Sequence, residues 1–313
     1  MRHLARLLAL VRAVTTLVRL RSRVLYLPLD GGLGLIYGAV MCVFARLIGA
    51  RIYLHHHSFA YIDARSAAFE LVLVSAGPSA THVVLCPAMG ERLRSRYPRL
   101  QNGQDRQRVV GNGFMIDTPA TPPRGKSERP LVIGHLSNLT REKGVLEVID
   151  LFEQLRREGV EVHARIAGPC ADKAILTRLS EANAVHGQAL EWIGPCYGEA
   201  KAEFLAGCDL FVFPTTYANE AQPLVLLEAL AAGLPILSID RGCIGCDFDA
   251  DFAMIAADLE EFRMRAPDWV VGLSNAPARL EALSGQAEAV AAKNKETAEA
   301  ALIALINEMA TAG

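Results

Sequence analysis

Apolar and polar positions along the chain form short blocks that predict strands and helices in alternation. In the first 113 residues, the predicted strands are short apolar runs bounded by polar residues, glycine or proline: 23–30, 50–57, 80–86 and 106–113. The helices predicted between them are 35–48, 64–77 and 87–98. Gly77 and Pro78 end the second of these helices, and Pro87 lies in the first turn of the third.

The same alternation continues after residue 130. The predicted strands there are 130–137, 160–168, 189–194, 209–215 and 234–240. The predicted helices are 144–159 and 223–233, with one or two more in the alanine-rich tail over 276–310. Regular alternation of strand and helix implies parallel sheets covered by helices on both faces.

Residues 117–130 separate the two halves, because they are rich in proline and polar residues and lack an apolar period. We therefore expect an α/β fold of two Rossmann-like domains facing a cleft. The predicted domains are 1–120 and 131–313, joined by a linker over 121–130. In such sheets, ligands bind at the carboxyl ends of the strands.

Length and charge limit the class of protein. A chain of 313 residues can form two domains with cores of their own. The formal net charge of −2 does not suggest a protein that binds nucleic acids. The longest apolar run, residues 31–45, is shorter than the about 18 residues of a membrane span, so we predict a buried helix there.

The amino terminus "MRHLARLLALVRAVTTLVRLRSR" predicts a basic amphipathic helix, since Arg6, Arg12 and Arg19 interrupt its apolar residues. Two interpretations stay open: contact with an anionic membrane surface, or a helix of the first domain with a solvated basic face. The sequence carries no secretory cleavage site, and its seven cysteines are irregularly spaced. We therefore expect reduced thiols and a cytoplasmic protein, peripheral at the inner membrane surface if the helix binds lipid.

Two glutamates, Glu220 and Glu228, flank the start of the helix that opens at Pro223. The first amides of this helix, from Leu224 and Val225, have no partner within it and can bind a phosphate. Glu228 lies one turn deeper, where a carboxylate can accept hydrogen bonds from the two hydroxyls of a ribose. The alternative is a solvated loop acid and an exposed helix acid, but Glu228 is the only charge in an otherwise apolar run.

The segment "NEAQPLVLLEALAAGLPIL" resembles the signature of two glutamates in retaining nucleotide-sugar glycosyltransferases with the GT-B fold (family four). Other segments resemble that family in the same order: "VVGNGF", "VIGHLSNLTREKGVLEVIDLFEQL", "IAGP" and "WIGPCYGEAKAEFLAGCDLFVFPT". The resemblance covers about residues 50 to 245. The family usually has more strand–helix units before a segment like "LHHHSF", so the first domain is expected to be shortened.

The resemblance implies a donor site around "TREKG", where Lys143 would pair with the donor's phosphates and Arg141 would be the second cation. The family more often has an arginine where this chain has His135. The matching segments also contain the other residues expected at the donor: Glu228, Gln222, Pro223, Leu224, Val225, Gly168 and Asn112.

Three adjacent histidines, His55 to His57, end a predicted strand. Neighbours on a strand point to opposite faces, so they cannot all bind one metal ion. By resemblance one of them contacts the transferred sugar, either His56 or His57, with His57 favoured. The pair Cys243 and Cys246 and the acidic loop 247–251 are interpreted as ordinary loop residues, so we expect no metal cofactor.

The resemblance implies transfer of a sugar from a nucleotide-diphosphate donor to an acceptor hydroxyl, with retention at the anomeric carbon. Glu220 would orient and support the sugar, and no metal would be required. The expected acceptor is a glycan or a lipid-linked molecule, as in surface polysaccharide synthesis. Two alternatives stay open: a catalytically silent nucleotide-sugar-binding subunit, and a nucleotide-sugar epimerase of the same fold.

Overall fold

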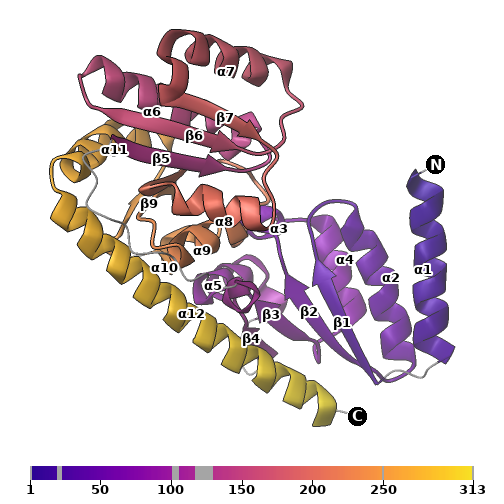
Figure 1. Cartoon of the computed structure of the whole chain (residues 1–313). Helices are drawn as coiled ribbons and strands as arrows, with labels where there is room; N and C mark the ends of the chain where they lie inside the picture. Colours follow the sequence, from indigo (N-terminus) through magenta and orange to yellow (C-terminus); the bar gives the residue numbers. More distant parts are fainter. Residues whose placement is uncertain (1, 20–22, 101–105, 117–129, 249, 312–313) are drawn as a thin grey trace. The chain divides into compact units, whose positions relative to one another are not determined.

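The computed structural model describes residues 2–19, 23–100, 106–116, 130–248 and 250–311, with only the backbone for residues 2–7 (Figure 1). The chain forms two compact units. The first unit contains residues 1–112, 218–222 and 297–313. The second unit contains residues 113–217 and 223–296.

The first unit has a parallel sheet whose four described strands follow the order β1-β2-β3-β4. Their bounds are Val24–Leu29, Arg51–His56, Thr81–Val84 and Gln107–Val109. The helices of this part of the chain are α1 (Arg2–Arg19), α2 (Gly34–Leu47), α3 (Ala60–Asp63), α4 (Ala67–Ala76), α5 (Pro87–Arg96) and the short 3-10 turn η1 (Pro98–Leu100). The predicted strands and helices of the first 113 residues are therefore confirmed, with ends that shift by a few residues.

The second unit has a parallel sheet in the order β10-β9-β8-β5-β6-β7, over the residues that the structure describes. The strands are β5 (Leu131–Leu136), β6 (Val162–Ala167), β7 (Leu190–Gly194), β8 (Leu210–Phe213), β9 (Ile236–Ile239) and β10 (Ala253–Ala256). The chain starts at the centre, moves outward to β7, returns to pair β8 with β5, and then continues in the other direction. The strand order thus reverses between β5 and β8.

The helices of the second unit follow from the same alternation. They are α6 (Val145–Arg157), α7 (Lys173–His186), α8 (Glu199–Ala206), α9 (Leu224–Ala231), α10 (Ile244–Asp247), α11 (Leu259–Ser274) and α12 (Pro277–Thr311), with the 3-10 turns η3 (Asn112–Met115), η4 (Arg141–Lys143) and η5 (Gly187–Ala189). Right-handed crossovers on either side of the reversal place helices on both faces of the sheet. The α/β fold with two parallel sheets, predicted from the sequence, is confirmed.

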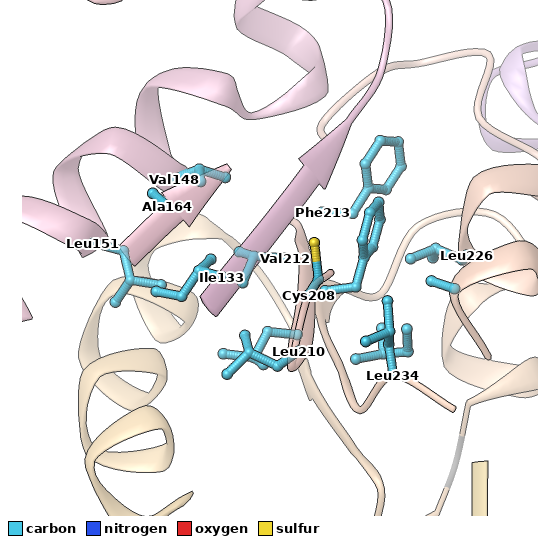
Figure 2. Close-up of a cluster of buried hydrophobic side chains, with 14 of the residues drawn as sticks. Ile133, Val148, Leu151, Ala164, Cys208, Leu210, Val212, Phe213, Leu226 and Leu234 are labelled. Atoms are coloured by element: carbon cyan, nitrogen blue, oxygen red, sulfur yellow. The ribbon is translucent and has the colours of Figure 1, made fainter. Parts of the chain in front are cut away.

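The core of the second unit lies against the two central strands. Ile133 of β5, and Leu210 and Val212 of β8, have no exposed surface, and Val148 of α6 packs among them (Figure 2). Strands covered on both faces are continuously apolar, as the segment "LFVF" is. Burial of each large aliphatic side chain contributes about 1.5–3 kcal/mol.

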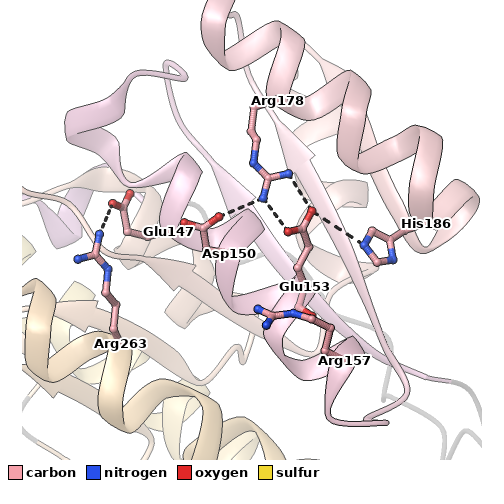
Figure 3. Close-up of polar contacts among 7 residues, drawn as sticks. All are labelled: Glu147, Asp150, Glu153, Arg157, Arg178, His186 and Arg263. Carbon is pink, nitrogen blue, oxygen red and sulfur yellow. Dashed lines mark hydrogen bonds and ion pairs between the residues drawn. The ribbon is translucent and has the colours of Figure 1, made fainter.

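An ion-pair network on the surface joins three helices on one face of this sheet (Figure 3). Arg178 of α7 donates to Glu153 at 2.7 Å and to Asp150 at 3.1 Å, both on α6. Arg263 of α11 donates to Glu147 of α6 at 3.3 Å. The helix α6 therefore lies between α7 and α11.

The end of α12 is held by the first unit. Glu308 accepts a hydrogen bond from Arg108 Nε of β4 at 2.6 Å and one from the Tyr53 hydroxyl of β2 at 3.3 Å. Residues 297–313 accordingly group with the first unit, whereas the predicted second domain extended over all of 131–313. The predicted linker lies outside the described residues except for Pro130. None of the described helices combines the length and the apolar character that crossing a membrane requires.

Candidate functional site

The reversal of strand order in the second unit creates a place where loops diverge. The loop after β5 leads into η4 and α6, and the loop after β8 leads towards α9. Because β5 and β8 are parallel neighbours, both loops leave at the same edge of the sheet. In open α/β sheets the crevice at such a switch point binds ligands.

Contacts with the end of β8 hold the η4 turn in position. The amide of Thr216 donates to the carbonyl oxygen of Glu142 at 2.8 Å. Gly144 adopts the left-handed conformation with φ of 82°, and a Cβ atom there would lie 2.5 Å from the carbonyl oxygen of Pro214. Only glycine tolerates both the positive φ and this close approach. The backbone on either side of Lys143 is therefore fixed against β8.

The Lys143 ammonium lies over two aromatic rings, one at the end of β8 and one in the loop after it. Its Nζ atom is 4.5 Å from the centre of the Tyr217 ring and 5.6 Å from that of Phe213. A cation over an aromatic face is stabilised by about 0.5–1 kcal/mol at an exposed site. The rings therefore hold the positive charge of Lys143 at the switch point of the sheet.

The other donor residues predicted in this part of the sheet have separate roles. Arg141 is exposed, and its Nε atom is 3.9 Å from Asp172 Oδ2, a distance at which surface ion pairs are weak. Gly168 has φ of 125°, and a Cβ atom there would lie 1.7 Å from the carbonyl oxygen of Ser137. Gly168 therefore allows the loops after β5 and β6 to meet, while Arg141 is accessible to an anion.

His135 is not the second cation. It is fully buried in β5, with Nδ1 2.8 Å from the carbonyl oxygen of Val212 and Nε2 3.0 Å from the hydroxyl of Ser137. Burial lowers the pKa of His135 to about 4. The side chain is neutral at pH 7 and connects β5 to β8, so His135 supplies no positive charge in this loop.

The helix α9 begins after Pro223, and its first amides, from Leu224 and Val225, have no acceptor within a helix of this geometry. Glu228, one turn further on, is about one fifth exposed and forms an ion pair with Lys201 of α8. The sequence did not predict this partner. The pair fixes the carboxylate of Glu228 on the side of α9 that faces α8.

In the first unit, two segments that are far apart in the sequence lie side by side. The Ser58 hydroxyl donates to Asn219 Oδ1 at 3.0 Å. Ser58 follows His57 directly, and Asn219 precedes Glu220, so the bond brings together the segments of the two predicted catalytic residues. Gly31, in the loop after β1, fits against this pair, since its Cβ atom would lie 2.6 Å from Asn219 Oδ1.

The structure distinguishes His56 from His57. His56 has no exposed surface, and its two ring nitrogens each lie 3.0 Å from a partner, the Tyr61 hydroxyl and His82 Nδ1. It therefore has no free nitrogen for a substrate, and the prediction that included His56 as a catalytic residue is corrected. His57 is half-buried; burial lowers its pKa, opposed by the charge of Asp30. His57 is the histidine available to a ligand.

Two further donor candidates bind each other in the first unit. The backbone amide of Asn112 donates to Gln222 Oε1 at 2.5 Å, and Asn112 Nδ2 donates to the carbonyl oxygen of Gln222 at 3.2 Å. Glu220, two residues before Gln222, is 7% exposed. These bonds give Asn112 and Gln222 the role of fixing the segment that contains Glu220.

The described residues contain no cluster of three or more histidine, cysteine or acidic side chains that could hold a metal ion. Cys243, directly before α10, is buried, and Cys246 within α10 is exposed. Asp251 is exposed, and Asp249 lies outside the described residues.

The sequence did not predict four residues of the site: Lys201, Tyr217, Ser58 and Asn219. Tyr217 is the only one with a sequence signal, because an aromatic residue follows "FVFPT" in the loop after a buried strand. The others depend on contacts between distant segments. No period or motif indicates them.

A large part of the second unit matches a known family model. Residues 119–247 match the family model described as glycosyl transferases group 1. Over 147 residues the chain is 28% identical to EpsF, a glycosyltransferase-type protein of Bacillus subtilis, covering 47% of this chain and 37% of that one. Over 179 residues it is 26% identical to the sulfoquinovosyl transferase SQD2 of Arabidopsis thaliana, covering 57% and 30%. The matched part is thus about a third of the length of these relatives.

Solved structures share the fold of the whole chain. HepE of Anabaena, crystallised with UDP, has a TM-score of 0.71 at 16% identity, over 96% of this chain and 82% of that one. The pneumococcal O-GlcNAc transferase GtfA, in complex with UDP and GlcNAc, has a TM-score of 0.70 at 16% identity, over 96% and 59%. At this identity the likeness establishes the fold. Residues 119–247 therefore resemble the group 1 glycosyl transferases in sequence, and the chain has the GT-B fold of two Rossmann-like domains.

Proposed function

We propose that this chain is a retaining glycosyltransferase, which moves a sugar from a nucleotide-diphosphate donor to an acceptor hydroxyl. The match of residues 119–247 to the group 1 family supports the class of reaction. The names of similar structures mention UDP, UDP-glucose and GlcNAc, which supports a nucleotide sugar as the donor.

The observation that carries the proposal is the position of Lys143. Its Nζ atom lies over the Tyr217 ring, 4.5 Å from the ring centre, at the switch point of the sheet. A diphosphate there would meet the ammonium and the accessible guanidinium of Arg141. The same loop after β8 leads to α9, whose first amides, from Leu224 and Val225, favour an anion. The ribose hydroxyls would then bind Glu228.

The proposed reaction exchanges one bond for another at the anomeric carbon. The bond to the diphosphate oxygen breaks, and the acceptor oxygen bonds to the same face of the sugar. The acceptor's proton moves to an oxygen of the departing diphosphate, so no separate base is needed. Lys143 and Arg141 stabilise the charge that develops on the leaving group. We propose that this charge stabilisation requires no metal ion.

We assign the sugar to the segments joined by Ser58 and Asn219. His57 is half-buried and neutral at pH 7, because burial lowers its pKa, so its ring can form hydrogen bonds with a sugar without a fixed charge. Glu220 orients the sugar and supports the positive charge that develops at its anomeric carbon. The hydrogen bond between Ser58 and Asn219 keeps the two residues in register.

We further propose that α1 contacts an anionic membrane surface, which suits a lipid-linked acceptor. Leu8, Val11 and Val18 of this helix are 55%, 56% and 41% exposed. Arg12 and Arg19 are exposed on the same side of the helix. Apolar side chains flanked by arginines favour the interface of an anionic bilayer. Sedimentation with anionic vesicles should fall for the Arg12→Gln/Arg19→Gln variant and stay absent with neutral vesicles.

A donor screen tests the central proposal. UDP, GDP and their common sugar conjugates are compared by thermal shift, and the best donor is then followed for release of its nucleotide and for transfer. Lys143→Ala should reduce donor affinity at least tenfold, whereas Lys293→Ala, at an exposed lysine of α12, should not change it. Equal donor affinity in the two variants would refute the site. An epimer formed from donor alone, without an acceptor, would refute transfer and support an epimerase.

A further inference from the structure

A cavity of about 90 Å³ lies in the first unit, where the strands β3 and β4 begin. Ten described residues line it: Gly77, Pro78, Ala80, His82, Leu93, Arg94, Arg99, Leu100, Arg106 and Gln107. The strands of this sheet are parallel, so His57 and Ser58, which follow β2, lie at the opposite edge. The cavity is therefore separate from the candidate functional site.

Its wall carries an excess of positive charge. Arg94 of α5, Arg99 of η1 and Arg106 before β4 all line it, and none of the ten described lining residues is acidic. Arg106 Nη1 donates to the carbonyl oxygen of Ser79 at 3.0 Å. The acid recorded beside Arg99 is Glu70, whose Oε2 atom is 3.9 Å from its Nε atom. Three guanidinium groups around one hollow repel one another, and an anion between them would relieve this repulsion.

The geometry of guanidinium groups narrows the kind of anion. Each presents planar N–H groups that bind two oxygens of a phosphoryl or carboxylate group at once. The three positive charges are balanced better by the nearly two negative charges of a phosphate monoester at pH 7 than by the single charge of a carboxylate. The cavity is therefore better suited to a phosphoryl group.

Apart from His82 and Gln107, the rest of the described wall is apolar. Leu93, Leu100, Pro78 and Ala80 complete it, so the occupant needs a carbon portion as well as its charged head. A volume of about 90 Å³ exceeds several times the ~15 Å³ that one water molecule requires. It accommodates a phosphoryl group and the first few carbons attached to it.

His82 adds a neutral polar group to the wall. Its Nδ1 atom is 3.0 Å from His56 Nε2, and the two rings stack with centres 5.3 Å apart. One proton lies between these nitrogens, so the tautomers of the two rings are linked. An anion in the cavity favours the form in which His82 has its proton on Nε2, because only that form leaves an N–H for the anion. His56 then donates to His82 and accepts from the Tyr61 hydroxyl.

We propose that this cavity is a binding site for a small organic phosphate, whose phosphoryl group Arg94, Arg99 and Arg106 hold while its carbon portion packs on Leu93 and Leu100. The site is independent of the proposed donor site. Its ligand is either a soluble phosphate monoester or the phosphomonoester headgroup of a lipid, which share this chemistry.

Isothermal titration of the full chain with hexyl phosphate tests the proposal. Inorganic phosphate, hexanoate and hexanol serve as probes of the head and the tail taken separately. Hexyl phosphate should bind at least tenfold more tightly than inorganic phosphate or hexanoate, and hexanol should not bind. Absence of hexyl phosphate binding to the wild-type chain would overturn the proposal.

Variants assign the binding to the cavity. Arg94→Gln/Arg99→Gln should weaken hexyl phosphate at least tenfold, whereas Arg12→Gln/Arg19→Gln, with the same change of charge on α1, should not affect it. The Lys143→Ala variant should bind it normally, which separates this site from the donor site. Equal binding in the Arg94→Gln/Arg99→Gln variant and the wild type would refute the assignment.

A measurement on the wild-type chain covers the case in which the double variant does not fold. Phenylglyoxal labels accessible arginines, and mass spectrometry identifies each one. Hexyl phosphate should protect Arg94 and Arg99 but not Arg12; labelling that hexyl phosphate leaves unchanged at all three would overturn the proposal. Vesicles with and without phosphatidic acid then distinguish the two sources. If retention on vesicles with phosphatidic acid falls in the Arg94→Gln/Arg99→Gln variant, the ligand of the cavity is the lipid headgroup. If retention is unchanged in that variant, α1 accounts for it, and the ligand of the cavity is a soluble phosphate.

Discussion

Lys201 of α8 and Glu228 of α9 form an ion pair in which both side chains are less than a third exposed. The pair links two helices that follow different strands of the second sheet. It holds the carboxylate that we assign to the donor's ribose in one orientation. Without Lys201, the Glu228 side chain would rotate towards solvent. Donor binding would then have to order this side chain, at a cost in conformational entropy.

Lys201→Met should therefore raise KM for the donor about tenfold, which corresponds to about 1.4 kcal/mol, and leave kcat almost unchanged. The ribose is remote from the reacting carbon, so its contacts are the same in the ground and transition states. Steady-state kinetics on Lys201→Met, Glu228→Gln and the double variant check this. If the double variant is worse than Glu228→Gln by the full effect of Lys201→Met, the two residues act independently and the positioning role is refuted.

The Tyr217 ring should matter through its face rather than its hydroxyl. Tyr217→Phe keeps the aromatic platform under Lys143 and should retain donor affinity. Tyr217→Ala removes it, and affinity should fall about three- to fivefold, as expected for about 0.5–1 kcal/mol. Isothermal titration with the best donor measures both. If Tyr217→Phe loses as much donor affinity as Tyr217→Ala, the hydroxyl and not the ring face contributes to donor binding.

A comparison of two glycines distinguishes the effect of backbone strain from that of a steric conflict. Gly144 and Gly159 flank α6 and have nearly equal φ, 82° and 81°, but only Gly144 has an atom within 4 Å of its missing Cβ, the carbonyl oxygen of Pro214 at 2.5 Å. Gly159→Ala should cost about 1 kcal/mol of unfolding free energy from strain alone. Gly144→Ala should cost more and also weaken donor binding, because it displaces Lys143.

Urea denaturation and donor titration of the two variants test this comparison. Donor affinity should stay normal in Gly159→Ala. If Gly144→Ala has the stability and donor affinity of Gly159→Ala, the close contact with Pro214 does not position the η4 turn.

Buried histidines should make the protein sensitive to mild acid. Burial lowers the pKa of His55 to about 3 and that of His82 to about 4 in the first unit, and that of His135 to about 4 in the second. Between these values and about 6.5, the unfolded chain binds more protons than the folded one. Stability is therefore fully present above pH 6.5 and is lost as the pH falls towards 4, by up to about 1.4 kcal/mol per histidine and pH unit.

Calorimetry at pH 7, 6 and 5 should show a melting temperature that falls before the carboxylates titrate. His135→Gln removes one of these groups and should reduce the slope of stability against pH, whatever its effect at pH 7. A pH slope in His135→Gln as steep as in the wild type would contradict the contribution of this residue.

The ion pairs of α6 differ in their expected contribution. Arg178 holds Glu153 and Asp150 with both of its Nη groups engaged, and it lowers the pKa of Glu153. Arg178→Met should cost about 1 kcal/mol, discounted because the groups are partly exposed. Because the folded pKa of Glu153 is depressed, this contribution is present above pH 4.5 and is lost as the pH falls through its folded pKa.

Arg156 provides the matched control. Its partner Glu161 has 75% of its side chain exposed, so Arg156→Met should change the unfolding free energy by less than about 0.5 kcal/mol. Urea denaturation at pH 7 compares the two variants. Equal losses of unfolding free energy in the two variants would mean that the several hydrogen bonds of Arg178 add no stability beyond that of a solvated ion pair.

The sequence by itself determined the local structure and the order of the site's parts. Apolar runs such as "LFVF" predict buried strands, and the period of Val145, Val148 and Phe152 predicts α6, because short-range patterns encode which face of an element is covered. Strand–loop–helix order also placed Lys143 and Gly168 after strands, at the edge where such sheets bind ligands.

The tertiary structure decided which residues meet. The pairing of β5 with β8 created the switch point, the ring of Tyr217 came under Lys143, and Lys201 became the partner of Glu228. It also buried His56 against His82 while leaving His57 accessible. These contacts join segments that are far apart along the chain, and no periodic pattern or motif in the sequence predicts them. They depend on strand order and helix packing, which the whole core determines together.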